Sequence, residues 1–355
     1  MDDGIRDVGA GFDLSKHMGP VPMFDLLSSD FAGQPVWMWL GFLAFVALLL
    51  AFDLGVLNRD DKVLGVAESF RLSAVYIAIA MLFGGAIWWG LGERPDGTSP
   101  ALDYFTGYFI EKSLSIDNVF VIALIFRYFA VPPAFQYRAL VWGILAAVVL
   151  RGVMILAGAS IVQSYDWVLY LFAAFLILTG IRMLLARDEG SEFKENRLVR
   201  LLRRQMRVTD GLHGNGFLVR QAEPAGGRML LHATPLFLAL IVINVADIIF
   251  AVDSVPAILA ITTDSFIVYT ANIMAILGLR ALYFALAAMI DRFHYLKYAL
   301  ALVLVFIGGK IYWGHLVGKV DPALALAVTV AIIAGGIVFS LWKTREKAED
   351  PASVR

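Results

Sequence analysis

The sequence contains no cysteine among its 355 residues. This absence excludes disulfide bonds, thiolate metal ligands and thiol catalysis by the chain itself. Charged residues are also scarce, at 17% of the chain, where a soluble domain carries about 25%. The net charge of −1 gives no sign of the basic surface that nucleic acid requires, so we expect no nucleic-acid partner.

We also expect no cleavable leader, because Met1 is followed by two aspartates rather than by a basic start and a short apolar core. What the chain has instead is apolar length: 60% of it is hydrophobic and its mean hydropathy is +0.76. Continuous runs of about 20 apolar residues match the thickness of a bilayer and exclude a barrel, whose strands alternate. The sequence therefore predicts an all-α polytopic membrane protein with about nine transmembrane helices. They are expected near 36–57, 71–91, 103–126, 138–162, 167–186, 235–260, 266–290, 296–318 and 323–342.

The lysines and arginines of the connections fall mainly on one side of these predicted spans, 20 against 4 on the other. By the positive-inside rule, this imbalance predicts that the N-terminus lies outside and the C-terminus in the cytoplasm. The membrane is expected to be the plasma (inner) membrane. The longest connection, 187–234, is basic. Its basic run, 197–207, is expected to form an amphipathic helix on the membrane surface, and the following segment, 208–220, with Asn215 and Gly216, a small hairpin. This loop is either a solvated linker or a surface for regulation or for membrane partner proteins.

An internal repeat organises the charged residues. A shift of 136 residues places Glu111 on Asp247, Asp117 on Asp253 and Asn118 on Ser254. Similar shifts place Arg151 on Arg280, and the Gly180 region on the Gly308 region. Three spans therefore recur, and because a three-span unit ends on the opposite side of the membrane from its start, the second copy must be inverted.

The repeat divides the chain into seven segments. They are an extracytoplasmic arm (1–35), two helices (36–102), repeat 1 with three helices (103–186), the cytoplasmic loop (187–234), repeat 2 with three helices (235–318), a last helix (319–342) and a cytoplasmic tail that we expect to be disordered (343–355).

Apart from the charged residues at the first two positions of a span, ten charged residues lie inside the predicted spans, five of each sign. Each is unfavourable by about 2.5–3.5 kcal/mol at a helix centre, so together they indicate a function or a salt-bridge network that fixes helix packing. Both readings stay open, but the acids have polar oxygens beside them. The acids are Asp53, Glu111, Asp117, Asp247 and Asp253; the cations are Lys112, Arg151, Arg182, Arg280 and Lys310.

Helical spacing indicates how the oxygens of each repeat gather. Glu111, Ser115 and Asn118 share one face of a helix. In the second copy the same holds for Asn244, Asp247 and Ser254. The second acid of each motif, Asp117 or Asp253, points about 120° away from the first on an ideal helix. Either the helices break, near 113–117 in the first copy and at Pro256 in the second, or the two acids serve different steps.

Carboxylate, amide and hydroxyl oxygens suit hard divalent cations such as Mn²⁺, Mg²⁺ or Ca²⁺. The motifs themselves carry a resemblance: segments 52–56, 111–121, 208–210, 247–264 and 276–284 are similar, in order and spacing, to the TerC family of integral membrane proteins. The resemblance covers roughly 40–320. One departure from the family pattern is Asn244, because many relatives resemble Val-Glu-x-x-Asp there and have a glutamate at this position. The chain therefore has one negative charge fewer at that place.

The resemblance implies export of a divalent metal, Mn²⁺ first among them, and the family name refers to tellurium resistance. On this reading the metal site comprises Asp117, Asp253, Glu111, Asp247, Asn118, Ser254 and Asn244; proton coupling or gating is assigned to Asp53, Glu111 and Asp247; the counter-charges are Arg151, Arg280, Lys112 and Lys310. Two alternatives remain. The protein could be a scaffold or stress-response protein acting through its loop, or an anion transporter using the arginines. We do not expect an enzyme, because no nucleophile, base and orienting group fall together.

Overall fold

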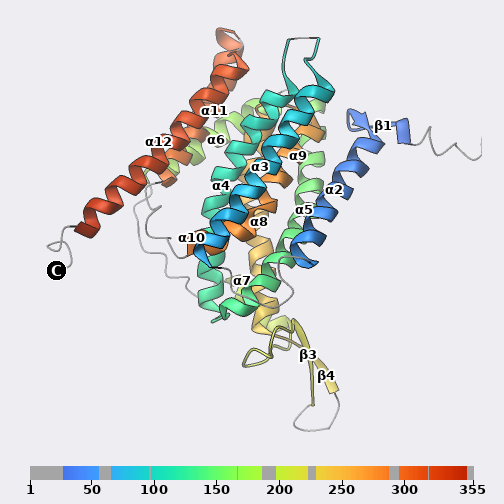
Figure 1. The fold of residues 1–355 in the computed structure, drawn as a ribbon, viewed down its shortest axis with the longest axis vertical. Helices are drawn as coiled ribbons and strands as arrows, with labels where there is room; N and C mark the ends of the chain where they lie inside the picture. The colour runs from blue at the N-terminus through green and yellow to red at the C-terminus, as the bar shows by residue number, and fades with distance from the viewer. Residues whose placement is uncertain are drawn as a thin grey trace, which may run out of the picture.

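The computed structural model shows a bundle of long helices (Figure 1). It describes residues 27–55, 65–95, 97–165, 167–185, 197–222, 229–287, 296–318 and 320–349. The long helices are α2 (Val36–Gly55), α3 (Val66–Leu91), α4 (Pro100–Tyr128), α5 (Pro133–Ser164), α6 (Trp167–Leu185), α8 (Pro235–Leu259), α9 (Ser265–Leu277), α10 (Leu279–Ala287), α11 (Leu296–Leu316) and α12 (Pro322–Glu349). The all-α class predicted from the sequence is confirmed, and the chain is a multi-pass integral membrane protein.

The helix starts follow local sequence signals. Proline, which has no amide hydrogen to leave unpaired, begins four of the helices, at Pro100, Pro133, Pro235 and Pro322. Asp264 caps α9, because its carboxylate accepts the backbone N–H groups of Phe266 and Ile267 at 3.0 and 3.2 Å. These signals fix where each helix enters the bundle.

Within the described residues, seven helices are long and apolar enough to cross a membrane: α2, α3, α5, α6, α8, α11 and α12. The predicted single span over 266–290 is instead a pair, α9 and α10, bent by 41° at Gly278; counted as one span, it makes eight. Helix α4 has the length but not the composition. Every 18-residue window of α4 contains Glu111, Lys112 and Asp117. The helix that carries the first motif thus has three charged residues in its middle.

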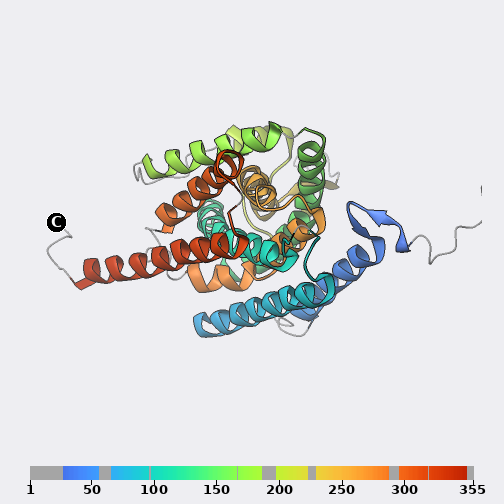
Figure 2. The same cartoon turned by 90° about the horizontal axis from the view of Figure 1, so that it is seen from above.

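Helix α4 runs through the middle of the bundle, with α3, α8, α9, α10, α11 and α12 around it (Figure 2). Helix α8 packs against α4, α5 and α6. Helices α2 and α3 lie on one side of the bundle and α6 on the opposite side. Helix α4, which carries the first acidic motif, is therefore enclosed by other helices, and α8, which carries the second, packs against it.

The outer faces of the bundle carry large apolar side chains, as a lipid-exposed surface should. Leu82 is 74% exposed and Leu178 61%. Exposed tryptophans lie near the ends of helices, for example Trp37 in α2, Trp89 in α3 and Trp167 in α6. Tryptophan favours the interface between lipid and water, so these positions fit the two edges of a bilayer.

Helices α6 and α11 approach each other through a reciprocal glycine contact. A Cβ atom at Gly180 would lie 2.6 Å from the Ala301 carbonyl oxygen, and one at Gly308 would lie 2.6 Å from the Ala173 carbonyl oxygen. The same shift of 128 residues relates Gly180 to Gly308 and Ala173 to Ala301. The contact is therefore one that a two-fold axis between the two helices would generate.

A valine at Gly308 is expected to destabilise the protein, because its Cβ would overlap a backbone oxygen that cannot move aside. Overpacking of this kind typically destabilises by about 1–3 kcal/mol. We expect Gly308→Val to lower the thermal unfolding midpoint in detergent. The adjacent Gly309→Val is the matched control, since nothing lies within 4 Å of a Cβ there. Equal midpoints for the two variants would contradict the close α6–α11 contact.

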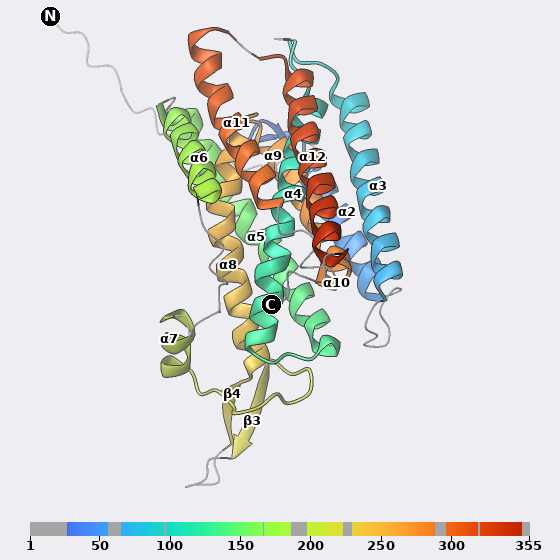
Figure 3. The ribbon, with the colours of Figure 1, turned by 90° about the vertical axis from the view of Figure 1, so that its left-hand side faces the viewer.

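The segment between α6 and α8 forms a small structure below one end of the bundle (Figure 3). It contains the short helix α7 (Arg197–Gln205) and an antiparallel hairpin of β3 (Leu218–Ala222) and β4 (Met229–Ala233). Asn215 and Gly216 precede β3, so they do not form the hairpin turn; the turn, 223–228, lies outside the described residues. A second, two-residue ladder joins β1 (Asp30–Phe31) to β2 (Gln34–Pro35) before α2.

The expectation of a disordered tail from residue 343 is wrong for its first part, because α12 continues to Glu349. Residues 343–349 are mostly good helix formers, and the helix they extend is already nucleated in the preceding span. Hydropathy locates the apolar run but not the point where the helix ends.

Candidate site around two buried carboxylates

The first acids of the two motifs meet at one arginine. Arg151 of α5 forms ion pairs with Glu111 of α4 and with Asp247 of α8. Its Nη2 and Nε donate to the two Asp247 oxygens at 2.7 and 3.1 Å, which is a two-pronged geometry. Arg151 and Glu111 are fully buried. The repeat therefore brings its equivalent carboxylates together, each on a different helix.

Asn272 of α9 completes this group. Its amide nitrogen donates to Glu111 Oε2 at 3.1 Å, and its amide oxygen accepts from Arg151 Nη1 at 2.9 Å. Sequence reasoning gave Asn272 no role. The available signal was its position: an amide inside an otherwise apolar span, eight residues before Arg280. A buried polar side chain in a span needs a partner.

The charges of this group do not balance. Two carboxylates face one guanidinium, so the group carries a formal charge of −1 when both acids are ionised. An uncompensated negative charge in a low-dielectric interior attracts a cation or a proton strongly. The site is suited to hold either one.

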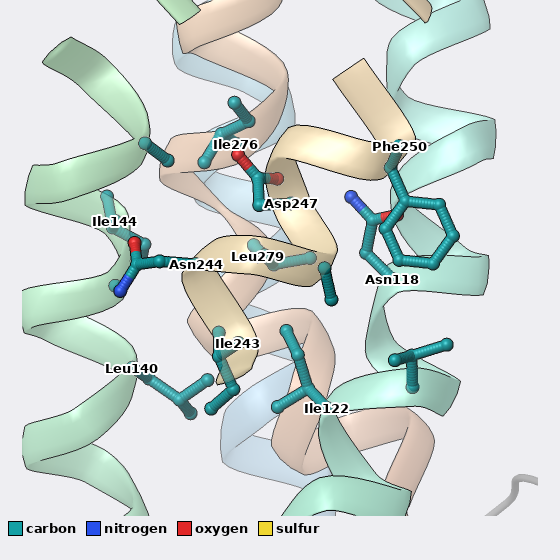
Figure 4. A pocket seen from close by; sticks show the side chains of 14 residues that line it. Asn118, Ile122, Leu140, Ile144, Ile243, Asn244, Asp247, Phe250, Ile276 and Leu279 are labelled. Atoms are coloured by element: carbon teal, nitrogen blue, oxygen red, sulfur yellow. The ribbon is translucent and has the colours of Figure 1, made fainter. Parts of the chain in front are cut away.

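Two small cavities adjoin the group. The first, about 30 Å³, is lined by Asn118, Asn244, Asp247 and Phe250 among others (Figure 4). The second, about 80 Å³, is lined by residues that include Glu111, Arg151, Asn118, Phe250 and Ser254. A water molecule occupies about 30 Å³ in the liquid. The larger cavity therefore has room for a small ion with one or two waters.

Two oxygen atoms beside these cavities are left without hydrogen bonds. They are the amide oxygens of Asn118 and Asn244, which are buried and have no partner in the described part of the chain. Asn244 donates its amide nitrogen to the Leu240 carbonyl at 2.8 Å, which leaves its oxygen available. Figure 4 shows the Phe250 ring beside Asn118, on the side of α8 that faces α4. It shows Asn244 on the other side of α8, which faces α5. Buried oxygens without partners are what a dehydrated cation would bind.

The predicted break in the motif helices is not present. Helix α4 is continuous through 113–117, and α8 continues past Pro256 to Leu259. Pro256 is three residues from the end of α8, where few hydrogen bonds remain to be lost. The alternative, that the first and second acids serve different steps, remains a prediction. The side chains of Asp117 and Asp253 lie outside the described part of the structure.

The second repeat arginine has a different partner. Arg280 of α10 is buried and forms an ion pair with Asp53 of α2, which lies outside the repeat. The guanidinium carbon also lies 4.7 Å from the centre of the Tyr137 ring. Its Nε and Nη1 have no hydrogen-bond partner among the described residues. Asp53 thus neutralises Arg280 and does not join the Arg151 group.

The two lysines predicted as counter-charges do not contact Glu111 or Asp247, the two motif acids whose side chains the structure describes. Lys112 donates to the Ala275 carbonyl at 3.2 Å, just before the break at Gly278. It caps the C-terminal end of α9, where a cation is favourable. Lys310 lines a different cavity and interacts electrostatically with Asp103 and Asp321. Both lysines are therefore assigned to other parts of the fold.

A loop arginine ties several segments together at the end of the bundle opposite the hairpin. Arg94 forms ion pairs with Asp103 of α4 at 2.7 Å and Asp264, the cap of α9, at 3.3 Å. Burial favours the neutral form of Arg94, but the hydrogen bonds and charges of Asp103 and Asp264 outweigh it and raise its pKa.

Among the described side chains, no three histidine, cysteine, aspartate or glutamate residues form a metal-binding cluster.

Comparison with known proteins gives one consistent result. The model of the "Integral membrane protein TerC family" matches residues 96–348. An uncharacterized membrane protein of Myxococcus xanthus is 43% identical over 308 residues, which cover 87% of this chain and 93% of that protein. A protein of Escherichia coli K12 with the name "Putative membrane-bound redox modulator Alx" is 44% identical over 314 residues, covering 87% of this chain and 95% of its own length. No solved structure matches the chain significantly. The chain belongs to the TerC family of integral membrane proteins.

Proposed function

We propose that this protein exports a divalent metal cation in exchange for protons, with Mn²⁺ as the first candidate. One observation carries the proposal: the equivalent acids of two repeated motifs, Glu111 and Asp247, meet at a single arginine beside cavities lined with unpaired oxygens. A purely structural ion pair would balance its charges, whereas this group has a surplus carboxylate. A transport site needs such a surplus, because it must bind a cation and then release it.

The architecture proposed is nine spans, with α4 as the ninth and the α9–α10 pair as one. The charges of α4 are tolerable in a span because the helices around it shield them from lipid. The reciprocal contact of Gly180 and Gly308 supports a two-fold axis between α6 and α11. An inverted repeat of α4–α6 and α8–α11 would generate this axis and place the site where its halves meet. The protein would lie in the inner membrane, with its N-terminus outside and its C-terminus in the cytoplasm.

The residues would share the work as follows. Glu111 and Asp247, with oxygens of Asn118, Asn244 and Ser254, would bind the ion, and Arg151 would occupy the carboxylates when the ion is gone. A buried carboxylate that loses a divalent ion is left uncompensated and takes up a proton. Metal and proton therefore compete for the same oxygens, which is the linkage that exchange requires. Asp117 and Asp253 would serve a neighbouring step of the same route.

The names of relatives suggest a redox role, which this chain cannot perform through thiols because it has no cysteine. The anion alternative has one observation in its favour, the two unpartnered nitrogens of Arg280. Arg151, in contrast, is already saturated by carboxylates and an amide. We therefore favour a cation as the transported species.

The test is Mn²⁺ uptake into proteoliposomes that contain the purified protein, driven by a pH gradient and read with a metal-sensitive dye. We expect uptake that depends on the gradient and falls at least about ten-fold in the Asp117→Asn/Asp253→Asn variant, because both acids belong to intramembrane motifs. The control is Glu68→Gln/Glu93→Gln, which removes two exposed carboxylates. Undiminished uptake in the first double variant would contradict the proposal, as would uptake of an anion instead of Mn²⁺.

A further inference from the structure

The structure contains a third, much larger cavity, at the end of the bundle opposite the hairpin. It has a volume of about 730 Å³ and is open on one side. Its wall includes Arg94, Asp103, Asp264, Lys310 and His315. A wide opening lined by charges of both signs is hydrated, so ions can enter it from the adjoining solution. We call this cavity the vestibule.

The vestibule and the larger cavity at the Arg151 group, called here the inner cavity, lie between the same four helices, α4, α6, α8 and α11, with α5 beside them. These four helices each contribute residues to both cavities, and α5 does so through Arg151 and Gln163. On α4 the vestibule reaches Thr106 and the inner cavity begins at Glu111, five residues further. That separation corresponds to about 7.5 Å along the helix. The two cavities are therefore neighbours along one line through the bundle.

Apolar side chains fill the gap between them. Ile110, Leu176, Ala257 and Ile307 belong to one hydrophobic cluster and are at most 2% exposed. Each comes from a different one of the four helices. In every case it lies between a vestibule residue and an inner-cavity residue in the sequence: Thr106, Ile110 and Glu111 on α4; Tyr170, Leu176 and Met183 on α6; Leu259, Ala257 and Ser254 on α8; Lys310, Ile307 and Leu304 on α11.

The edges of the same cluster complete the connection. Ala260 and Ile261 pack against it and line the vestibule. Leu114 and Met183 pack against it and line the inner cavity. The cluster is thus in contact with both cavities and separates them. An apolar constriction of this kind excludes water and, with it, any hydrated ion.

We infer that the route from the inner cavity to the solution runs between α4, α6, α8 and α11, and that Ile110, Leu176, Ala257 and Ile307 are an apolar barrier that closes it in this conformation. The vestibule is the chamber into which a cation passes once the barrier opens. The inference rests on the proposed function for the identity of the ion, but not for the location of the route. Helices α6 and α11, which carry no acid of the motifs, thereby become walls of the pathway.

The absence of cysteine makes the barrier directly testable, because any introduced cysteine is the only thiol in the chain. The full-length protein is reconstituted in liposomes and treated with a charged, membrane-impermeant methanethiosulfonate. Gln163→Cys, at an exposed position of the vestibule, reports whether reagent added on one side of the membrane reaches the vestibule. Ser254→Cys, a near-isosteric change in the inner cavity, reports whether the reagent passes the barrier.

We expect Ser254→Cys to react at least about a hundred-fold more slowly than Gln163→Cys, because the barrier is dry. Adding Ile110→Ala or Ile307→Ala should accelerate its reaction at least about ten-fold from the vestibule side. Ile125→Ala is the matched control, an equally buried isoleucine of α4 that belongs to another cluster and lies beyond the inner-cavity residue Asn118. Thermal unfolding of each variant identifies any that do not fold, and Leu176→Ala then replaces it.

Three outcomes would overturn the inference: rapid reaction of Ser254→Cys in the unaltered background, no acceleration in either barrier variant, or equal acceleration by Ile125→Ala. The assay needs no transported ion. If Mn²⁺ uptake is absent but the labelling pattern is as expected, the proposed function fails and the barrier stands. If uptake is present and the pattern fails, the reverse holds.

Discussion

Replacement of Arg151 by methionine is expected to prevent accumulation of stable, folded protein. The methionine fills similar space but leaves the buried Glu111 and the partly buried Asp247 without their shared cation. Breaking a buried ion pair by removing one partner typically destabilises by about 3–5 kcal/mol. Total stability of a domain is about 5–15 kcal/mol, so the loss is a large part of it. The measurement is the yield of monodisperse protein in detergent and its unfolding midpoint.

The control for this change is Arg182→Met, because Arg182 lies on the exposed face of α6 in a neighbouring span. Near-normal yield of that variant shows that losing an arginine from a helix is not itself the cause. If Arg151→Met were as stable as Arg182→Met, the Arg151 group would not be the compensated charge cluster described above.

A compensated variant separates stability from transport. In Arg151→Met/Glu111→Gln/Asp247→Asn the buried charges are removed together, and such replacements are often neutral or stabilising. We expect this triple variant to regain the yield and unfolding midpoint of the parent protein while its Mn²⁺ uptake stays absent. If the triple variant transports at the parent rate, the Arg151 group is structural and the metal passes elsewhere.

The position of the acids could be predicted from the sequence, but their partners could not. The shift of 136 residues pairs Glu111 with Asp247, and helical spacing places Asn118 and Asn244 on the same faces as these acids. The spacing of charges along a helix says nothing about how neighbouring helices are rotated. That rotation sends Arg151 to the motif acids, Arg280 to Asp53 and Lys112 to a backbone carbonyl.

The break at Gly278 shows the same limit of local reasoning. Proline is the strongest helix breaker, yet Pro256 near the end of α8 leaves that helix continuous. The chain bends instead at Gly278, where a Cβ would lie 2.9 Å from Lys112 Nζ and 3.1 Å from Tyr76 Cβ. Close packing from α3 and α4, absent from the local sequence, selects the glycine. The bend is what places Asn272 and Arg280 on separate helices, α9 and α10.

Substitution of Asp53 by asparagine is the second change with a large expected effect. Arg280 is buried and Asp53 is its carboxylate partner in the described structure, so the variant leaves an isolated cation in the bundle. The expected loss of stability is again about 3–5 kcal/mol, and Mn²⁺ uptake should fall at least about ten-fold. Asp53→Glu keeps the charge and should retain most of the uptake, whereas Asp53→Asn/Arg280→Gln should recover stability without it.

The reason lies in the unequal treatment of two equivalent arginines. Arg151 binds the first acid of each motif, Glu111 and Asp247. Its counterpart Arg280 binds an acid from outside the repeat, and two of its nitrogens have no hydrogen-bond partner among the described residues. In an inverted repeat, the opposite conformation exchanges the environments of the two halves. Arg280 would then form an ion pair with Glu111. Until it does, the Asp53 carboxylate balances the positive charge of Arg280. Full uptake by a stable Asp53→Asn protein would show that Arg280 needs no such partner and that the two arginines do not alternate.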